Sequence, residues 1–160
     1  MEDGNALKVG TPRIAAQGRL KLAGLSGRYT QTSAVDIPLL WDRFVTMMGT
    51  IPGQVGHVSY GVCCNADGAG GFEYIAAVEV ADFGALPDDL GRIELPARRY
   101  AVFTHAGHVS GLPATVRGVW RALPTLGLAV ASAPDFERYG PAFDGRTGMG
   151  EVEIWIPLKD

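Results

Sequence analysis

The chain has 160 residues and a mass of 16.9 kDa, which fits one domain better than two. Hydrophobic residues make up 47% and charged residues 19%, so a sizeable core can form and a wholly disordered chain is excluded. The net charge of −3, without any basic stripe, argues against a surface that binds nucleic acid. No apolar run reaches the length of a membrane span, and the acidic start does not resemble a secretory signal. We therefore expect a cytoplasmic domain that contacts neither nucleic acid nor membrane directly.

Residues 1–11 carry no periodic pattern and are predicted to form a loose leader, so the folded domain is expected over 12–160. The two cysteines, Cys63 and Cys64, are adjacent in an apolar run. Because neighbours on a strand point to opposite faces, we expect them to be free and buried rather than paired with each other. No cysteine and histidine spacing suits zinc, and neither a metal nor a cofactor is expected.

Taken in chain order, the predicted elements are a strand, a helix and two strands, and then the same series again. The first helix is expected to begin at Ile37, with Asp36 as its N-cap. The second is expected to begin near Ser110 or Leu112 and to end before Gly127. The predicted strands cover 19–29, 58–65, 72–81, 98–106, 135–140 and 151–158.

The two series match in detail, which predicts an internal duplication. Ala23 in the first strand precedes Trp41 in the first helix, and Ala101 precedes Trp120 at nearly the same spacing. Both tryptophans are predicted to pack in the core. The expected fold class is α+β: duplicated βαββ repeats related by a pseudo-twofold axis, with one antiparallel sheet, two helices on one face and a ligand groove on the other. The repeats are expected at about 12–82 and 92–160.

The last strand presents an unusual pair of residues, Glu153 and Trp155, on the face away from the helices. A carboxylate that is partly desolvated among aromatic rings favours a cation nearby, so we predict a groove that binds flat, cationic compounds with broad specificity. The alternative is an ion pair between Glu153 and Arg99 or Arg138, on a face that is merely solvated. Aromatic residues on other strands that can reach this groove are Tyr60, Phe72, Tyr74, Tyr100, Phe103, Phe136 and Tyr139.

His105 and His108 flank Gly107 at the predicted start of the second helix. Two histidines three residues apart could suggest a metal site, but no third ligand follows at a useful spacing. We expect the imidazoles to satisfy backbone groups at the helix entry instead.

Five segments of the chain resemble the GyrI-like small-molecule-binding family, whose module is also the effector-binding domain of AraC-type transcription activators. The resemblance runs from about Arg13 to the C-terminus. It is most specific in the Phe-Glu-Arg-Tyr segment and in the closing Glu-Ile-Trp-Ile-Pro-Leu segment. The segments are Tyr60–Asn65, Phe72–Val80, Tyr100–His105, Asp135–Tyr139 and Val152–Leu158.

The resemblance implies a ligand groove between the repeats, in which Glu153 meets cationic, often aromatic, ligands while Trp155 and tyrosines stack on them. No helix-turn-helix segment precedes Arg13, so a free-standing binding protein for a drug or effector is expected rather than direct control of transcription. The ligand-binding residues expected on this basis are Glu153, Trp155, Tyr60, Tyr74, Phe103 and Tyr139.

The same resemblance leaves two alternative functions open. Some stand-alone relatives are hydrolases that open strained cyclopropane rings, and Glu153 would then be the general base. Other relatives dock on a partner protein. Nothing in the sequence separates a glutamate that binds cations from one that activates water, so binding is the first hypothesis, hydrolysis the second and a protein-interaction module the third.

Overall fold

The computed structural model describes residues 10–160, so the predicted leader at 1–11 lies almost wholly outside the described residues. Among the residues described, no helix is both long and apolar enough to cross a membrane. The helices are α1 (Ile37–Val45) and α2 (Leu112–Ala122), with short 3-10 turns at Ser33–Asp36, Val109–Gly111 and Leu123–Leu126. The strands are β1 (Arg13–Gln17), β2 (Leu20–Tyr29), β3 (Gln54–Cys64), β4 (Phe72–Val80), β5 (Gly91–Leu95), β6 (Arg98–Ala106), β7 (Asp135–Tyr139), β8 (Phe143–Asp144) and β9 (Met149–Pro157).

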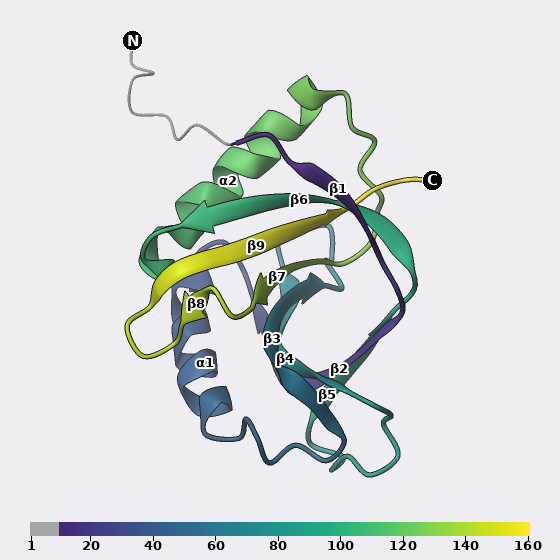
Figure 1. Ribbon diagram of the computed structural model, residues 1–160, viewed down its shortest axis with the longest axis vertical. Coiled ribbons are helices and arrows are strands. Elements are labelled where there is room, and N and C mark those ends of the chain that lie inside the picture. Colours follow the sequence, from purple (N-terminus) through teal and green to yellow (C-terminus); the bar gives the residue numbers. More distant parts are fainter. Residues whose placement is uncertain (1–9) are drawn as a thin grey trace.

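All the strands join one antiparallel sheet in the order β1-β6-β9-β7-β3-β4-β2-β5, with β8 paired to β9. The sheet curls into a half-barrel, and Figure 1 shows α1 and α2 along one side of it. The predicted α+β class, the antiparallel sheet and the two helices on one face are therefore confirmed.

The strand order is symmetric about the β3–β7 pair, as a pseudo-twofold axis requires. Two short strands, β1 and β5, were not predicted from the sequence pattern, and each pairs with a strand of the other half. The first half contributes β1 to the edge beside β6, and the second half contributes β5 to the edge beside β2. Each is five residues long, and each finds its partner in the other half, so its pattern is not visible in a local window.

The pairing registers show which residues are equivalent in the two halves. The predicted match of Ala23 with Ala101 makes Gly61 the counterpart of Glu137. These two residues also pair directly with each other across β3 and β7, so they lie where the pseudo-twofold axis meets the sheet. The registers that establish this are Ala23↔Val78 with Gly61↔Ala76 in one half, and Ala101↔Ile156 with Glu137↔Ile154 in the other.

The two helices begin where the sequence predicts. Asp36 stands at the N-cap of α1, although its side chain makes no capping hydrogen bond, and Leu40 and Phe44 are the buried residues of that helix. α2 begins at Leu112, and the turn that follows it ends at Gly127, whose φ of +69° belongs to the left-handed region.

The structure confirms the prediction for His105 at the start of α2 and contradicts the prediction for Trp120. His105 is buried; its Nδ1 lies 2.7 Å from the Thr115 hydroxyl and its Nε2 lies 2.9 Å from the carbonyl oxygen of His108. The predicted structural role of this histidine is therefore confirmed. The prediction that Trp120 packs in the core is wrong, since its exposed fraction is 42%.

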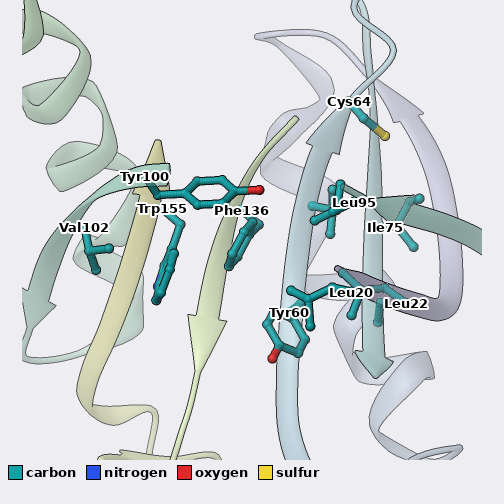
Figure 2. Packing of buried hydrophobic residues seen from close by; sticks show 12 residues of the cluster. Leu20, Leu22, Tyr60, Cys64, Ile75, Leu95, Tyr100, Val102, Phe136 and Trp155 are labelled. Carbon is teal, nitrogen blue, oxygen red and sulfur yellow. The ribbon is translucent and has the colours of Figure 1, made fainter. Parts of the chain in front are cut away.

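The sheet is apolar on both faces. On the outer face, one cluster packs around α1 and another around α2. On the inner face, the curl brings the two ends of the sheet together, and Figure 2 shows Tyr100, Trp155 and Phe136 facing the leucines of β2 and β5. Side chains therefore fill most of the space where an open groove was expected. The buried residues of this inner cluster are Leu20, Leu22, Tyr60, Val62, Cys64, Ile75, Ala77, Leu95, Tyr100, Val102, Phe136 and Trp155.

Candidate functional site

A hydrogen-bonded carboxylate occupies the outer face of the sheet, beside α1. Tyr74 and Tyr139 donate their hydroxyl protons to Oε1 of Glu137 at 2.9 and 2.8 Å, and Nε1 of Trp41 donates to the Tyr74 hydroxyl oxygen at 2.9 Å. No hydrogen bond between described residues reaches Oε2 of Glu137. One oxygen is thus held by the protein, and the other is left for a further partner. We call Trp41, Tyr74, Glu137 and Tyr139 the Glu137 cluster.

A glycine makes this arrangement sterically feasible. Gly61 is the strand partner of Glu137, and a Cβ at this position would collide with the Tyr74 hydroxyl and approach Oε1 of Glu137 to 2.8 Å. The two counterpart residues on the pseudo-twofold axis therefore differ in kind. The second repeat contributes the acid, Glu137, and the first contributes Gly61, because only glycine is small enough to leave room for it.

Aromatic rings surround the Glu137 carboxylate. They also connect the apolar cluster around α1 with the apolar cluster around α2. The Trp41 ring meets the Tyr139 ring edge to face, with centroids 5.1 Å apart. Trp41 packs against both outer-face clusters, so it bridges the two repeats directly over Glu137. The prediction that Trp41 serves only as core packing is too narrow, since its indole N–H belongs to the hydrogen-bond chain that ends at Glu137.

The electrostatics of the cluster are unusual because a desolvated acid has no cation beside it. Burial raises the pKa of Glu137, although the hydrogen bonds from Tyr139 and Tyr74 partly lower it. None of the ion pairs between described residues includes Glu137. Glu137 is half-buried as a residue, but Trp41 lies over its carboxylate, so a positively charged molecule could reach the carboxylate once Trp41 moves aside. An aromatic surround with one unpaired acid is suited to binding a cation.

The six residues predicted to bind ligand do not form one site. Strand alternation fixes which residues of one strand share a face, but it does not say which faces of different strands coincide. The structure divides the six into two groups of three. Glu153, Trp155 and Tyr60 lie toward the inner face of the curl, whereas Tyr74, Phe103 and Tyr139 lie on the outer face with the helices.

The expectation that Glu153 lacks an internal counter-ion is wrong. Its Oε2 lies 3.0 Å from Nη2 of Arg13, and its Oε1 lies 3.6 Å from Nη1 of Arg138. Nε1 of Trp155 donates to Oε1 at 3.1 Å, and the Arg13 guanidinium lies 5.7 Å from the centre of the Trp155 ring. The alternative reading, an ion pair with Arg138, is therefore confirmed, and Arg13 adds a second cation that tethers β1 to β9.

A surface hollow of about 270 Å³ adjoins Glu153 at the rim of the inner face, away from the Glu137 cluster. Its lining is polar on one side, from Arg138 and two glutamates, and apolar on the other. Arg138 and Glu153 already pair with each other, and Glu151 is exposed to solvent. The hollow therefore offers a ligand less electrostatic attraction than the desolvated Glu137 does. The lining residues are Arg138, Gly140, Pro141, Ala142, Glu151 and Glu153.

We expect Glu153→Gln to loosen β1 with little effect on global stability. Arg13 is 54% exposed and Arg138 is 32% exposed in their side chains, and exposed pairs contribute at most about 1 kcal/mol. Amide hydrogen exchange should speed up in residues 13–17 and stay unchanged in β3 and β4. Equal protection of β1 in both proteins would contradict the tether.

The sequence carried a signal for the missed acid. Glu137 belongs to the Phe-Glu-Arg-Tyr segment, and period-two alternation places it on the same face as Tyr139. No comparable signal exists for Gly61 or Trp41, since their approach to Glu137 depends on the pairing of β3 with β7 and on how α1 crosses the sheet.

The duplicated α+β fold, with the unpaired Glu137 among aromatic rings where the repeats meet, is that of a domain of the small-molecule-binding class. Residues 11–159 match the family described as the GyrI-like small molecule binding domain. The match covers almost the whole chain, and the protein therefore belongs to the GyrI-like family.

Known relatives agree with this assignment. The transcriptional regulator BrlR of Pseudomonas aeruginosa is 33% identical over 122 residues, which cover 74% of this chain and 45% of that regulator. The chain thus spans less than half the length of this relative.

Solved structures show the same fold. SAV2435 bound to tetraphenylphosphonium has a TM-score of 0.71 and 23% identity, over 92% of this chain and 93% of that one. A putative transcription regulation protein from Staphylococcus aureus MU50 has a TM-score of 0.74 and 21% identity, over 93% of this chain and 98% of that one.

Proposed function

We propose that the protein binds small cationic or amphipathic aromatic compounds, as drugs or effectors, at the Glu137 cluster between the two repeats. The observation that carries this proposal is the free Oε2 of Glu137, which has no counter-ion among the residues described and is surrounded by three aromatic side chains. Glu137 thereby takes the role that the sequence assigned to Glu153. Tyr74 and Tyr139 keep their predicted role as ligand contacts.

The expected attraction is large enough to matter. A charge pair 4 Å apart at an effective dielectric of about 20 gains roughly 4 kcal/mol before desolvation is subtracted. A cation over an aromatic face gains a further ~0.5–2 kcal/mol. Neither the charge pair nor the cation–π contact requires the ligand to have one particular shape, so we expect the site to accept a broad range of cationic aromatic compounds. Tetraphenylphosphonium, the ligand of the structural neighbour SAV2435, combines a delocalised charge with aromatic rings and is a suitable probe.

Access to Oε2 depends on α1, because Trp41 covers the carboxylate. This helix has nine residues, of which Leu40 and Phe44 are buried and Trp41 is only partly buried, so Trp41 is held less firmly than the two buried residues that fix the helix to the sheet. We infer that a ligand enters by displacing the Trp41 side chain and then stacks on the rings of Tyr74 and Tyr139.

The test compares tetraphenylphosphonium with triphenylphosphine oxide, a neutral compound with the same type of ring. In calorimetric titrations, Glu137→Gln should weaken the cation at least about tenfold, which corresponds to 1.4 kcal/mol, and leave the neutral compound nearly unchanged. The glutamine carbonyl can still accept from both tyrosines, so the fold should persist.

Glu153→Gln is the matched control, since it removes the same charge at the inner rim. It should change both affinities by less than about twofold. If this variant, rather than Glu137→Gln, weakens the cation, the site is the hollow beside Glu153. If neither does, or if both compounds weaken alike, the charge-based proposal fails.

Hydrolysis of strained-ring compounds is the second candidate, favoured by the raised pKa of Glu137. A carboxylate of higher basicity is a better general base. It would take a proton from water while the water oxygen attacks a cyclopropane carbon and the ring C–C bond breaks. The electron pair of that bond would pass to an electron-withdrawing group conjugated with the ring, and the proton held by Glu137 would then return to the opened product. Incubation with a cyclopropane-bearing alkylator should then give the ring-opened alcohol, and Glu137→Gln should give none. Tight binding without product would reject this activity.

A further inference from the structure

A second carboxylate, Asp135, shares a strand face with Glu137. The two residues are separated on β7 only by Phe136, which points into the inner cluster. Alternation along the strand puts both acids on the outer face, about 7 Å apart along β7. At this separation the negative charge of Glu137 helps to raise the pKa of Asp135.

No cation in the described part of the chain faces Asp135. Its strand partner across the sheet is Cys63, and burial raises the pKa of that thiol well above its ordinary value, so the thiol stays neutral. The titratable groups around Asp135 are thus Glu137 on its own strand, the Cys63 thiol on β3 and the Cys64 thiol beside it. None of the hydrogen bonds or ion pairs between side chains of residues 10–160 includes Asp135.

Only one repeat carries these acids. The pseudo-twofold axis that relates Gly61 to Glu137 relates Ser59 to Asp135. Glu137 therefore stands at the axis and Asp135 to one side of it, on the same strand, and both residues are half-buried on the same face. A desolvated acid without a partner costs stability, which a cationic ligand would relieve.

We propose that Asp135 is a second anionic contact of this site, so that the site prefers aromatic compounds with two positive centres about 7 Å apart over compounds with one. This inference rests on the proposed function at Glu137. It assigns Asp135 to the selection of dications, while Glu137 binds the first positive centre.

The preference should depend on pH in a defined direction. Burial, together with the charge of Glu137, raises the pKa of Asp135 to about 7. At pH 6 this side chain is mostly protonated, and at pH 8 it is mostly ionised. The advantage of a dication over a monocation should therefore grow between pH 6 and pH 8.

Ethidium and propidium test the proposal, because they share one planar ring system and propidium adds a quaternary ammonium on a three-carbon arm. In fluorescence titrations at pH 8, propidium should bind about tenfold more tightly than ethidium, which corresponds to 1.4 kcal/mol. Asp135→Asn should remove most of that ratio and its pH dependence while leaving ethidium within about twofold. Glu137→Gln should weaken both dyes.

The possible outcomes separate the two proposals. If ethidium binds through Glu137 but propidium gains nothing, or if Asp135→Asn weakens both dyes equally, the role of Asp135 is refuted and the proposed function stands. If neither dye binds in a Glu137-dependent way, the proposed function itself fails. Thermal melts of each variant establish that it is folded, and Asp88→Asn, an exposed acid far along the chain, should leave the ratio unchanged.

Discussion

Gly61→Ala is expected to weaken cation binding strongly and to destabilise the protein by about 1–3 kcal/mol, the usual cost of overpacking a buried site. The added methyl would occupy the space of the Tyr74 hydroxyl and crowd Oε1 of Glu137. Tyr74 would have to withdraw from Glu137, which breaks the hydrogen-bond chain from Trp41. We expect tetraphenylphosphonium affinity to fall more than tenfold in titration calorimetry, and the urea midpoint to fall with it.

Gly18→Ala is the control for this substitution. Gly18 is exposed, and a Cβ there would meet no atom within 4 Å, so stability and affinity should both stay within error of the parent protein. Wild-type affinity in a folded Gly61→Ala protein would show that the space beside Glu137 is not part of the binding site.

The contribution of Asp135 to the stability of the protein should decrease as the pH rises from about 4 to about 7. The pKa of Asp135 is raised from 3.8 to about 7 in the folded state, so the native protein holds a proton that the unfolded chain releases. The stability associated with this proton is fully present below pH 4 and is lost as the pH passes 7. The shift corresponds to at most about 4 kcal/mol. The raised pKa of Glu137 acts in the same direction.

Urea denaturation of the parent protein and of Asp135→Asn at pH 4, 6 and 8 measures this effect. The variant should be nearly equal to the parent at pH 4 and more stable by a few kcal/mol at pH 8, since asparagine has no charge to desolvate. Asp88→Asn should change stability little at any pH. A difference between parent and Asp135→Asn that is the same at pH 4 and pH 8 would contradict the assigned pKa.

The helices and most strands were predictable because their signals are local. The spacing of apolar residues after Asp36 and the glycine at 127 fix helix limits within a few residues. The repeat was visible for the same reason, since both halves carry matched residues such as Ala23 and Ala101. β1 and β5 were missed because each is stabilised by a strand from the other half.

The sequence predicted the kind of site, an acid among aromatic rings, but it did not predict that the acid would be Glu137. An anion without a counter-ion among aromatic rings was expected, and the described structure contains one. The local signal for Glu137, an acid on the same strand face as Tyr139, is matched by an equal signal for Glu153, which shares a face with Trp155, so the sequence pattern does not choose between them. Arg13, from a distant strand, neutralises Glu153, whereas no described cation reaches Glu137.

The amino-acid sequence by itself determined the helices, most of the strands and the duplication, because these follow from short-range spacing and side-chain chemistry. Only the tertiary structure decided which glutamate is left unpaired. Charge compensation depends on distances between strands that are far apart in the chain, and those distances exist only once β3 and β7 meet at the pseudo-twofold axis and the sheet has curled.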